Sequence, residues 1–522
     1  MKLERPRPIL KPIHVVLSAI LLAPLSAAEL KLATLFSDHM VLQRDKAVPV
    51  WGWADAGEKI TVTFGAQTKS SAANADGKWM VKLDPMPANA TAQKLSVQSE
   101  KADRSAAADD VLVGEVWLGS GQSNMAMKVS GAQDFEAEKA KAGLPLIRMF
   151  TENSGAARAA AANASGKWDV CSPESVGSFS ATLFFFGREV QHDLGVPVGL
   201  INSSVGGTPI ESWIAAEAQA KSPALKAAHE KSAASEAKFD EAAAKAQFEK
   251  AMERWKEQAE KAKADGKPAP KQPLDPLVQR NRRGGPGGLF NGKIAPLIPY
   301  AIGGVVWYQG EANTRGGGGD DYSHQLPLLV TDWRSRWNDE LPFAWVQLPN
   351  FVRPGEGWPR VREAMLKTLN LPRTGMAIAI DVGDPKNIHP KNKQEVGHRL
   401  ALWALGDVYG RKVAATSGPR PAKHEVKGAD VVVSFTHTNG GLAAKGGEVK
   451  GFVIAGEDRA WKPATARIQG DKVIVSSAEV KAPVAVRYAW EDNPECNLAN
   501  GAGLPASPFR TDDWPELPAP AQ

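Results

Sequence analysis

Ser123 stands where a predicted strand gives way to a helix, a setting that could make its hydroxyl a nucleophile. An apolar run ends at Leu118, a Gly-Ser-Gly turn follows, and Ser123 comes two residues later, after Gln122. Val, Trp and Leu favour a buried strand, and the glycines permit a sharp turn into a helix. Such a turn lifts a side chain above the carboxyl ends of a sheet and leaves backbone N–H groups free beside it. Ser123 could instead be no more than the N-cap of that helix.

Three further loops follow predicted strands, and with Ser123 they supply the residues of a hydrolytic site. They are Gly206-Gly207, Gln309-Gly-Glu311 and the segment from Asp384 to His389. In a doubly wound sheet these loops share one edge. His389 would take the proton of Ser123 and later return it, while a carboxylate holds the imidazole in the right tautomer. The N–H groups of Ser123 and Gly207 and the amide of Gln309 could bind the oxyanion, each worth roughly 3 kcal/mol.

The carboxylate that orients His389 is open between three residues. Asp384 is the first choice, with Asp381 and Glu311 behind it, and a Ser–His dyad assisted by a backbone carbonyl is the alternative. Glu311 could equally be a buried structural carboxylate bound by loop amides. Four neighbours are predicted to bind substrate or to support the site: Gln122, Asn124, Glu311 and Asn313.

The central part of the chain, residues 111–410, alternates predicted strands with helices, which favours a doubly wound parallel sheet. The expected strands lie at 111–118, 198–202, 301–308, 343–348 and 375–380, and the expected helices at 181–190, 322–337 and 394–405. Residues 215–265, rich in Ala, Lys and Glu, predict a helical insertion. Residues 266–288 are expected to be a loop, in which Arg280, Arg282 and Arg283 carry solvated charge.

Short alternating strands flank this part on both sides. Residues 29–110 predict a small β-sandwich with strands at 48–53, 59–64 and 78–83. Residues 411–522 predict a second β-rich region with strands at 430–435, 472–477 and 484–490. Gly, Asn and Asp separate these runs, as is typical of turns between strands.

Residues 1–28 have the pattern of a secretory signal peptide. A basic start precedes the apolar stretch from Ile13 to Leu25, which is too short for a comfortable membrane span, and cleavage is expected after Ala28. We therefore expect an exported protein, periplasmic or extracellular, without stable membrane insertion once the signal is removed. Export would permit Cys171 and Cys496 to pair, although two unpaired buried thiols fit the sequence equally well.

Composition narrows the class of function. The 522 residues carry a formal net charge of only +5, which gives no reason to expect a nucleic-acid partner. No Cys/His spacing indicates a metal site, so we expect neither a metal nor another cofactor.

Four motifs together resemble the sialate O-acetylesterase family of SGNH-type hydrolases: residues 121–125, 206–213, 307–313 and 383–390. The resemblance implies a flavodoxin-like α/β/α catalytic domain with a parallel sheet, and hydrolysis of O-acetyl esters on sugars by a serine mechanism without metal. It implies that Ser123 is the nucleophile and His389 the base, with the Gly-Gly and Gln-Gly-Glu loops near the oxyanion. Many SGNH enzymes carry Asp three residues before the histidine, where this chain has Lys386.

The sequence therefore predicts a secreted carbohydrate O-acetylesterase that acts on an acetylated carbohydrate, either a sialate or a plant-type polysaccharide. A non-catalytic glycan-binding protein on a hydrolase scaffold is the alternative, and intact Ser123 and His389 argue against it. A glycosidase using Glu311 and Asp384 would leave Ser123 without a role.

Overall fold

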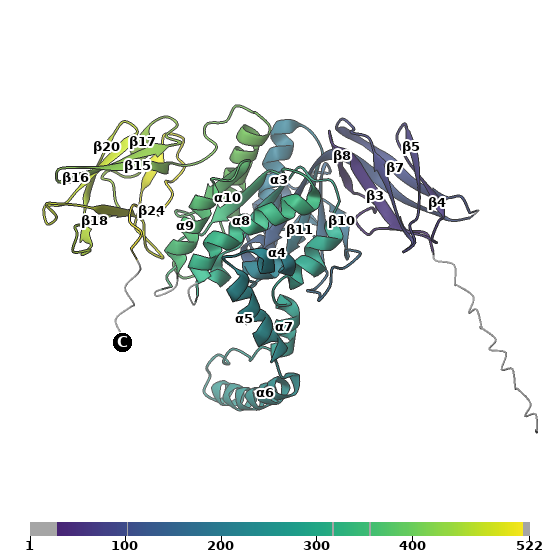
Figure 1. Ribbon diagram of the computed structural model, residues 1–522, viewed down its shortest axis with the longest axis horizontal. Coiled ribbons are helices and arrows are strands. Elements are labelled where there is room, and N and C mark those ends of the chain that lie inside the picture. Colours follow the sequence, from purple (N-terminus) through teal and green to yellow (C-terminus); the bar gives the residue numbers. More distant parts are fainter. Residues whose placement is uncertain (1–28, 102, 316–317, 354–356, 515–522) are drawn as a thin grey trace, which may run out of the picture.

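Strand β8 (Ser105–Gly121) belongs to two parts of the molecule at once (Figure 1). In the computed structural model, which describes residues 29–101, 103–315, 318–353 and 357–514, its first half pairs antiparallel with β7 (Asn89–Ser99). Its last seven residues, Glu115–Gly121, pair parallel with β11 (Val198–Ser204). The predicted division at residue 110 therefore falls inside one continuous strand.

The central sheet has the strand order β10-β9-β11-β8-β12-β13-β14. Neighbours from β9 to β14 are parallel, and β10 is an antiparallel strand at one edge. The other strands are β9 (Ile147–Glu152), β10 (Gly166–Val170), β12 (Gly304–Tyr308), β13 (Phe343–Gln347) and β14 (Thr374–Ile378). The predicted parallel sheet is confirmed, and its parallel strands bring their carboxyl ends to one edge.

Helices cover both faces of this sheet because alternate strand residues point to opposite sides. Trp117 and Tyr308 share one core cluster with α3 (Ala181–Leu194) and α10 (Lys393–Trp403). Trp307 and Trp345 are on the opposite face of the sheet. They lie in the other core cluster, with α8 (Gly318–Trp337) and α9 (Trp358–Thr368). The helices predicted at 181–190, 322–337 and 394–405 are confirmed, and α9 is a helix that the sequence analysis did not predict.

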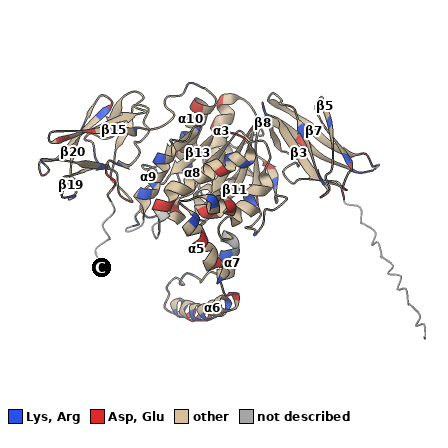
Figure 2. Cartoon of the chain, viewed as in Figure 1, with Lys and Arg blue, Asp and Glu red and all other residues tan. Residues whose placement is uncertain are grey.

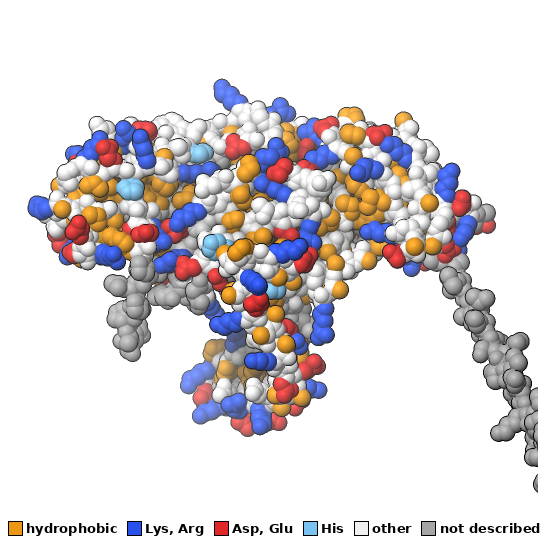
Figure 3. All heavy atoms as spheres, in the orientation of Figure 1, with side chains coloured by type: hydrophobic (Ala, Val, Ile, Leu, Met, Phe, Trp, Pro, Cys, Tyr) orange, Lys and Arg blue, Asp and Glu red, His pale blue; other side chains and the backbone are white. Residues whose placement is uncertain are grey.

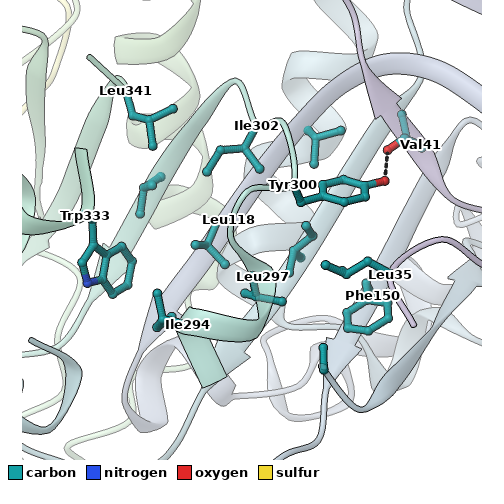
Figure 4. Packing of buried hydrophobic residues seen from close by; sticks show 14 of the residues in the cluster. Leu35, Val41, Leu118, Phe150, Ile294, Leu297, Tyr300, Ile302, Trp333 and Leu341 are labelled. Carbon is teal, nitrogen blue, oxygen red and sulfur yellow. Dashed lines mark hydrogen bonds between the residues drawn. The ribbon is translucent and has the colours of Figure 1, made fainter. Parts of the chain in front are cut away.

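The strands before β8 form two sheets whose facing side chains share the larger core. They are β1 (Lys31–Leu32), β2 (Val41–Gln43), β3 (Val48–Trp53), β4 (Lys59–Phe64), β5 (Gln67–Ala72) and β6 (Lys78–Leu83). Tyr300 joins this region to the central sheet: its ring packs in the shared core and its hydroxyl donates to the Val41 carbonyl at 2.8 Å (Figure 4). The strands predicted at 48–53, 59–64 and 78–83 are confirmed.

The helical insertion projects from the body of the molecule (Figure 1). It comprises α4 (Ala216–Lys221), α5 (Lys226–Ala237), α6 (Glu241–Ala264) and α7 (Pro276–Arg283). Helix α6 has no buried residue, and charges of both signs lie along it (Figure 2). Figure 3 shows both signs interspersed over the visible face of the whole molecule.

The prediction of a loop over 266–288 is wrong where α7 forms. Asp275 caps the helix by accepting from the Leu277 N–H at 2.8 Å, Pro276 occupies the first turn, and Gly284 ends it with φ +64°. Proline just inside the start and glycine just past the end is a helix signature. Arg280 is not solvated linker charge, because its guanidinium donates to the Glu236 carboxylate of α5 at 2.5 Å.

The strands after residue 411 form three small sheets around their own core. They are β15 (Arg420–Lys427), β16 (Asp430–Thr436), β17 (Leu442–Ala444), β18 (Phe452–Ala455), β19 (Lys462–Pro463), β20 (Thr465–Gln469), β21 (Lys472–Ser476), β22 (Ala485–Tyr488), β23 (Leu498–Asn500) and β24 (Phe509–Arg510). The strands predicted at 430–435, 472–477 and 484–490 are confirmed in their positions.

Two further predictions concern the export of the protein and the pairing of its cysteines. The predicted signal peptide, residues 1–28, lies outside the described residues. Among the residues that the structure describes, none of the helices combines the length and the apolar character needed to cross a bilayer. Cys171 and Cys496 are free thiols, so the unpaired alternative is the one observed.

Arg362 of α9 joins the central sheet to the C-terminal strands. Its fully buried guanidinium donates to the carbonyls of Leu348 and Pro349 after β13, both at 2.8 Å. It also donates to the carbonyls of Glu491 at 2.6 Å and Asp492 at 2.9 Å. One side chain therefore satisfies four acceptors from two separate segments, and its loss would leave them without a donor.

We expect Arg362→Met to lower the free energy of unfolding by about 3–5 kcal/mol, because buried carbonyls lose their partner. Urea denaturation followed by circular dichroism measures the change. Lys367→Met on the same helix is the control, because the Lys367 ammonium is exposed and its partner Glu363 keeps two hydrogen bonds from Arg510. Equal stability of the two variants would contradict the role given to Arg362.

Candidate active site

The turn from β8 into α1 (Ser123–Ala126) depends on Gly121. Its φ is +132°, and a Cβ there would lie 2.2 Å from the Tyr308 carbonyl oxygen of β12. The same carbonyl accepts from the Gln122 N–H at 2.9 Å, which fixes the turn against the neighbouring strand. The helix begins at Ser123 as predicted, and its N-cap is Gln122, not Ser123.

Ser123 and His389 meet at the carboxyl edge of the sheet. The Ser123 Oγ lies 2.7 Å from Nε2 of His389, although 266 positions separate the two residues in the chain. Both are half-buried, so solvent can reach the pair. A hydroxyl held this close to an imidazole can pass its proton to the ring as it attacks an electrophile.

The environment of His389 favours the neutral form of its ring. Burial, and then the positive charge of Lys393, lower the pKa of His389 below its usual 6.5. The neutral imidazole is the form that can accept a proton from a hydroxyl.

Asp384 forms no hydrogen bond with the imidazole of His389. Asp384 Oδ1 accepts from the Lys386 N–H at 2.8 Å, and Asn387 Oδ1 accepts from the His389 N–H at 3.0 Å. These are two local turns in succession, in which each side chain binds the backbone two residues on. Among the described residues no carboxylate is hydrogen-bonded to His389, and the hydrogen bond of Asp384 is to the backbone of its own loop.

The two other candidate acids are occupied elsewhere. Asp381 binds the Arg399 guanidinium through both of its oxygens, at 2.6 and 3.0 Å. Glu311 Oε1 accepts from the Asn124 side-chain amide at 2.5 Å, and burial raises the pKa of Glu311. The reading of Glu311 as a buried carboxylate bound by an amide is the one observed, but the amide comes from a side chain.

Gln309 braces the loops and does not present a free donor. Its buried Nε2 donates to Gln122 Oε1 at 3.2 Å, to the Thr208 carbonyl at 3.1 Å and to Asn313 Oδ1 at 2.7 Å. An amide has two N–H groups, and both are used within the protein. This geometry does not support Gln309 as a donor to an oxyanion.

The predicted supporting role of Gln122 and Asn313 fits their contacts. Gln122 Oε1 also accepts from the Ala312 N–H at 3.2 Å, and Asn313 Oδ1 accepts from the Ile210 N–H at 2.9 Å. Asn313 Nδ2 donates to the Glu211 carboxylate at 3.0 Å. Three loops of the sheet edge are thereby tied together under the surface.

Two backbone N–H groups in the loops after β8 and β11 have no acceptor among the described residues. Gly207 is exposed with φ +71°, and open space surrounds the position of a Cβ. Within the described part of the chain, no acceptor binds the N–H of Gly207 or of Ser123. Free N–H groups at such a position can stabilise a developing negative charge.

Sequence reasoning missed Lys393, the first residue of α10. It is fully buried, and it donates to the side chain of Asn124. Lys386 and Lys391 precede it in the same short stretch and are exposed, so no pattern in the sequence distinguishes the buried lysine from its neighbours.

A serine hydroxyl bound to a neutral imidazole beside free N–H groups is the arrangement typical of a serine hydrolase. Comparison with known proteins agrees with this class. Residues 113–266 and 291–405 match the family model described as carbohydrate esterase, sialic acid-specific acetylesterase.

Full-length relatives and a solved structure extend the match. The human sialate O-acetylesterase is 30% identical over 549 residues, with 95% of each chain covered, and that of Rattus norvegicus is 30% identical, with 92% of this chain and 94% of the rat protein covered. A carbohydrate acetylesterase from Xanthomonas citri has a TM-score of 0.79 and 36% identity, with 93% of this chain and 100% of that chain covered. The chain therefore belongs to the sialic acid-specific acetylesterase family of carbohydrate esterases, and it is an esterase.

The lowered pKa of His389 predicts the acid limit of activity. Because only the neutral ring accepts a proton, activity should be full above that pKa and fall as the pH drops through it. We expect the acid limb of kcat/KM for p-nitrophenyl acetate to have its midpoint below 6.5, the usual pKa of histidine. A midpoint above that value would contradict the assignment of His389 as the base.

Proposed function

We propose that this esterase is a secreted carbohydrate O-acetylesterase that uses Ser123 as nucleophile and His389 as general base. The observation that carries the proposal is the 2.7 Å contact between Ser123 Oγ and His389 Nε2. The names of the relatives, sialate O-acetylesterase and carbohydrate acetylesterase, support an acetylated carbohydrate as substrate. The predicted signal peptide supports export.

The reaction follows from these groups in two halves. Ser123 Oγ attacks the acetyl carbonyl carbon while its proton passes to His389 Nε2. The N–H groups of Ser123 and Gly207 hold the oxyanion, and its collapse expels the sugar oxygen, which takes the proton from His389. A water then attacks the acetyl-Ser123 ester with His389 again as base, releasing acetate and the free serine.

The proposed mechanism is a dyad, which was the alternative to a triad with Asp384. The backbone N–H of His389 donates to Asn387 Oδ1, and the imidazole itself contacts Ser123. Asp384, Asp381 and Glu311 all have other partners.

We also assign the catalytic part to the flavodoxin-like SGNH type, and propose residues 29–110, 111–410 and 411–522 as its three domains. Numbered along the chain, the sheet β11-β8-β12-β13-β14 has the order 2-1-3-4-5 that flavodoxin-like folds share. Strands β9 and β10 extend this sheet at one edge.

Replacing the nucleophile tests the function directly. Ser123→Ala should abolish acetate release, because nothing else in the site can form the acetyl intermediate. The control is Ser130→Ala, an exposed serine a few residues on, which should keep full activity. Acetate is measured from acetylated sialic acid, xylan, xyloglucan and pectin, and circular dichroism checks the fold. Full activity of Ser123→Ala would remove the proposed nucleophile.

The dyad makes a separate prediction for Asp384→Asn. In a triad that substitution costs about 10⁴-fold in kcat, whereas a residue that only shapes the loop should cost less than about tenfold. Asn keeps an oxygen that can accept from the Lys386 N–H, so the turn should survive. A loss near the triad value, in a folded variant, would restore Asp384 to the catalytic set.

A further inference from the structure

Lys393 lies beneath the Ser–His pair and has no role in the proposed reaction. Its side chain is fully buried, which is rare for lysine because transferring a charge out of water is costly. Its Nζ donates to Asn124 Oδ1 at 2.8 Å and to the Pro390 carbonyl at 2.6 Å. The ammonium also lies 5.5 Å from the centre of the Tyr308 ring.

Glu311 supplies the opposite charge through Asn124. Asn124 Nδ2 donates to Glu311 Oε1 at 2.5 Å, while its Oδ1 accepts from Lys393. The other carboxylate oxygen of Glu311 is buried and has no partner in the described chain. A carboxylate at one end and an ammonium at the other leave the amide only one orientation. Burial lowers the pKa of Lys393 to about 7, and the charge of Glu311 opposes that shift.

Two members of this Glu311–Asn124–Lys393 network, Asn124 and Lys393, also bind the backbone around His389. Asn124 Nδ2 donates to the Ile388 carbonyl at 3.0 Å, and Lys393 donates to the Pro390 carbonyl. The carbonyls of the two residues that flank His389 are thus both bound. Asn124 directly follows Ser123, so the same side chain joins the nucleophile's segment to the loop that carries the base.

We propose that Lys393 is a positioning residue of the esterase: with Glu311 and Asn124 it fixes the backbone on both sides of His389, so that the imidazole meets the Ser123 hydroxyl. The proposal rests on the proposed function, in which Ser123 and His389 perform the reaction. Lys393 itself is buried and does not touch the substrate.

Replacing Lys393 should have different effects if it acts through the Glu311–Asn124–Lys393 network and if it only fills space. A long apolar side chain such as Met could fill the same volume, but it would leave the Pro390 carbonyl and Asn124 Oδ1 without a donor and Glu311 without its counter-charge. The charged or titratable groups facing Lys393 are Glu311 from the loop after β12, Tyr308 from β12 and His389 from its own loop. Removing the cation therefore also changes the field at His389.

The test compares Lys393→Met with Lys391→Met, an exposed lysine of the same loop. For Lys393→Met we expect kcat to fall on the order of 10²-fold, the effect of a small displacement of a catalytic group, with KM nearly unchanged. Labelling of Ser123 by a serine-directed phosphonate should slow in proportion. The acid limb of kcat/KM should move to higher pH, because the cation that lowers the pKa of His389 is gone. Lys391→Met should behave as the unmodified enzyme.

A double variant, Glu311→Gln with Lys393→Met, distinguishes loss of the Glu311–Asn124–Lys393 network from a general loss of packing. It removes both charges and leaves no unpaired buried carboxylate, so it should recover at least about tenfold of the lost kcat. This variant also decides the matter if Lys393→Met alone does not fold.

Two results would overturn the proposal. One is Lys393→Met with kcat within about twofold of Lys391→Met; the other is a loss of kcat with an unmoved acid limb and an unchanged labelling rate. Failure of the proposed function is distinguishable, because then Ser123 of the unmodified enzyme would not react with the phosphonate at all.

Discussion

The parallel pairing of β8 with β11 and β12 is the constraint on which the site depends. In that register Gly121 lies opposite Ser204 on one side and Tyr308 on the other. Three strands therefore end at the same level, and the loops that leave them carry Ser123, Gly207 and Gln309 within a few residues. No side chain could replace the glycine at the end of β8, because the neighbouring backbone occupies the space. Sheet pairing thus sets the position of the nucleophile before any side-chain contact does.

Several polar side chains are buried below this edge of the sheet. Gln309, Gln122 and Asn313 form one hydrogen-bonded set, and Asn124 and Lys393 belong to another. Such groups are expensive to bury, but once their partners are in place the low local dielectric strengthens each bond and leaves few alternative arrangements. The network gives the half-buried Ser–His pair a rigid support, which matters because no carboxylate is hydrogen-bonded to the imidazole among the described residues.

The C-terminal strands also reach the loop of the base. Asn350, after β13, accepts from the Gly383 N–H at 2.9 Å and donates to Asn493 Oδ1 at 2.8 Å. Together with the four carbonyls that Arg362 binds, these contacts attach the segment around residue 492 to the edge where His389 lies. The β-rich end of the chain therefore supports the site. Without it, Arg362 and Asn350 of the catalytic part would lose hydrogen-bond partners.

The sequence by itself determined five strands of the central sheet, the helices α3, α8 and α10 and the four loops, because hydrophobic periodicity and glycine-rich turns are local signals. It did not indicate β9, β10 or α9. It also singled out Ser123 and His389, whose residue types suit a nucleophile and its base. It did not show that α7 interrupts the predicted loop, although Pro276 and Gly284 carried that signal. Only the tertiary structure decided that Asp384 turns toward its own backbone, that the Gln309 amide is used within the protein, and that Lys393 is the buried lysine of its stretch. Those outcomes depend on which partners lie within about 3 Å in the folded chain. Local sequence patterns do not specify the distance between residues that are far apart in the sequence.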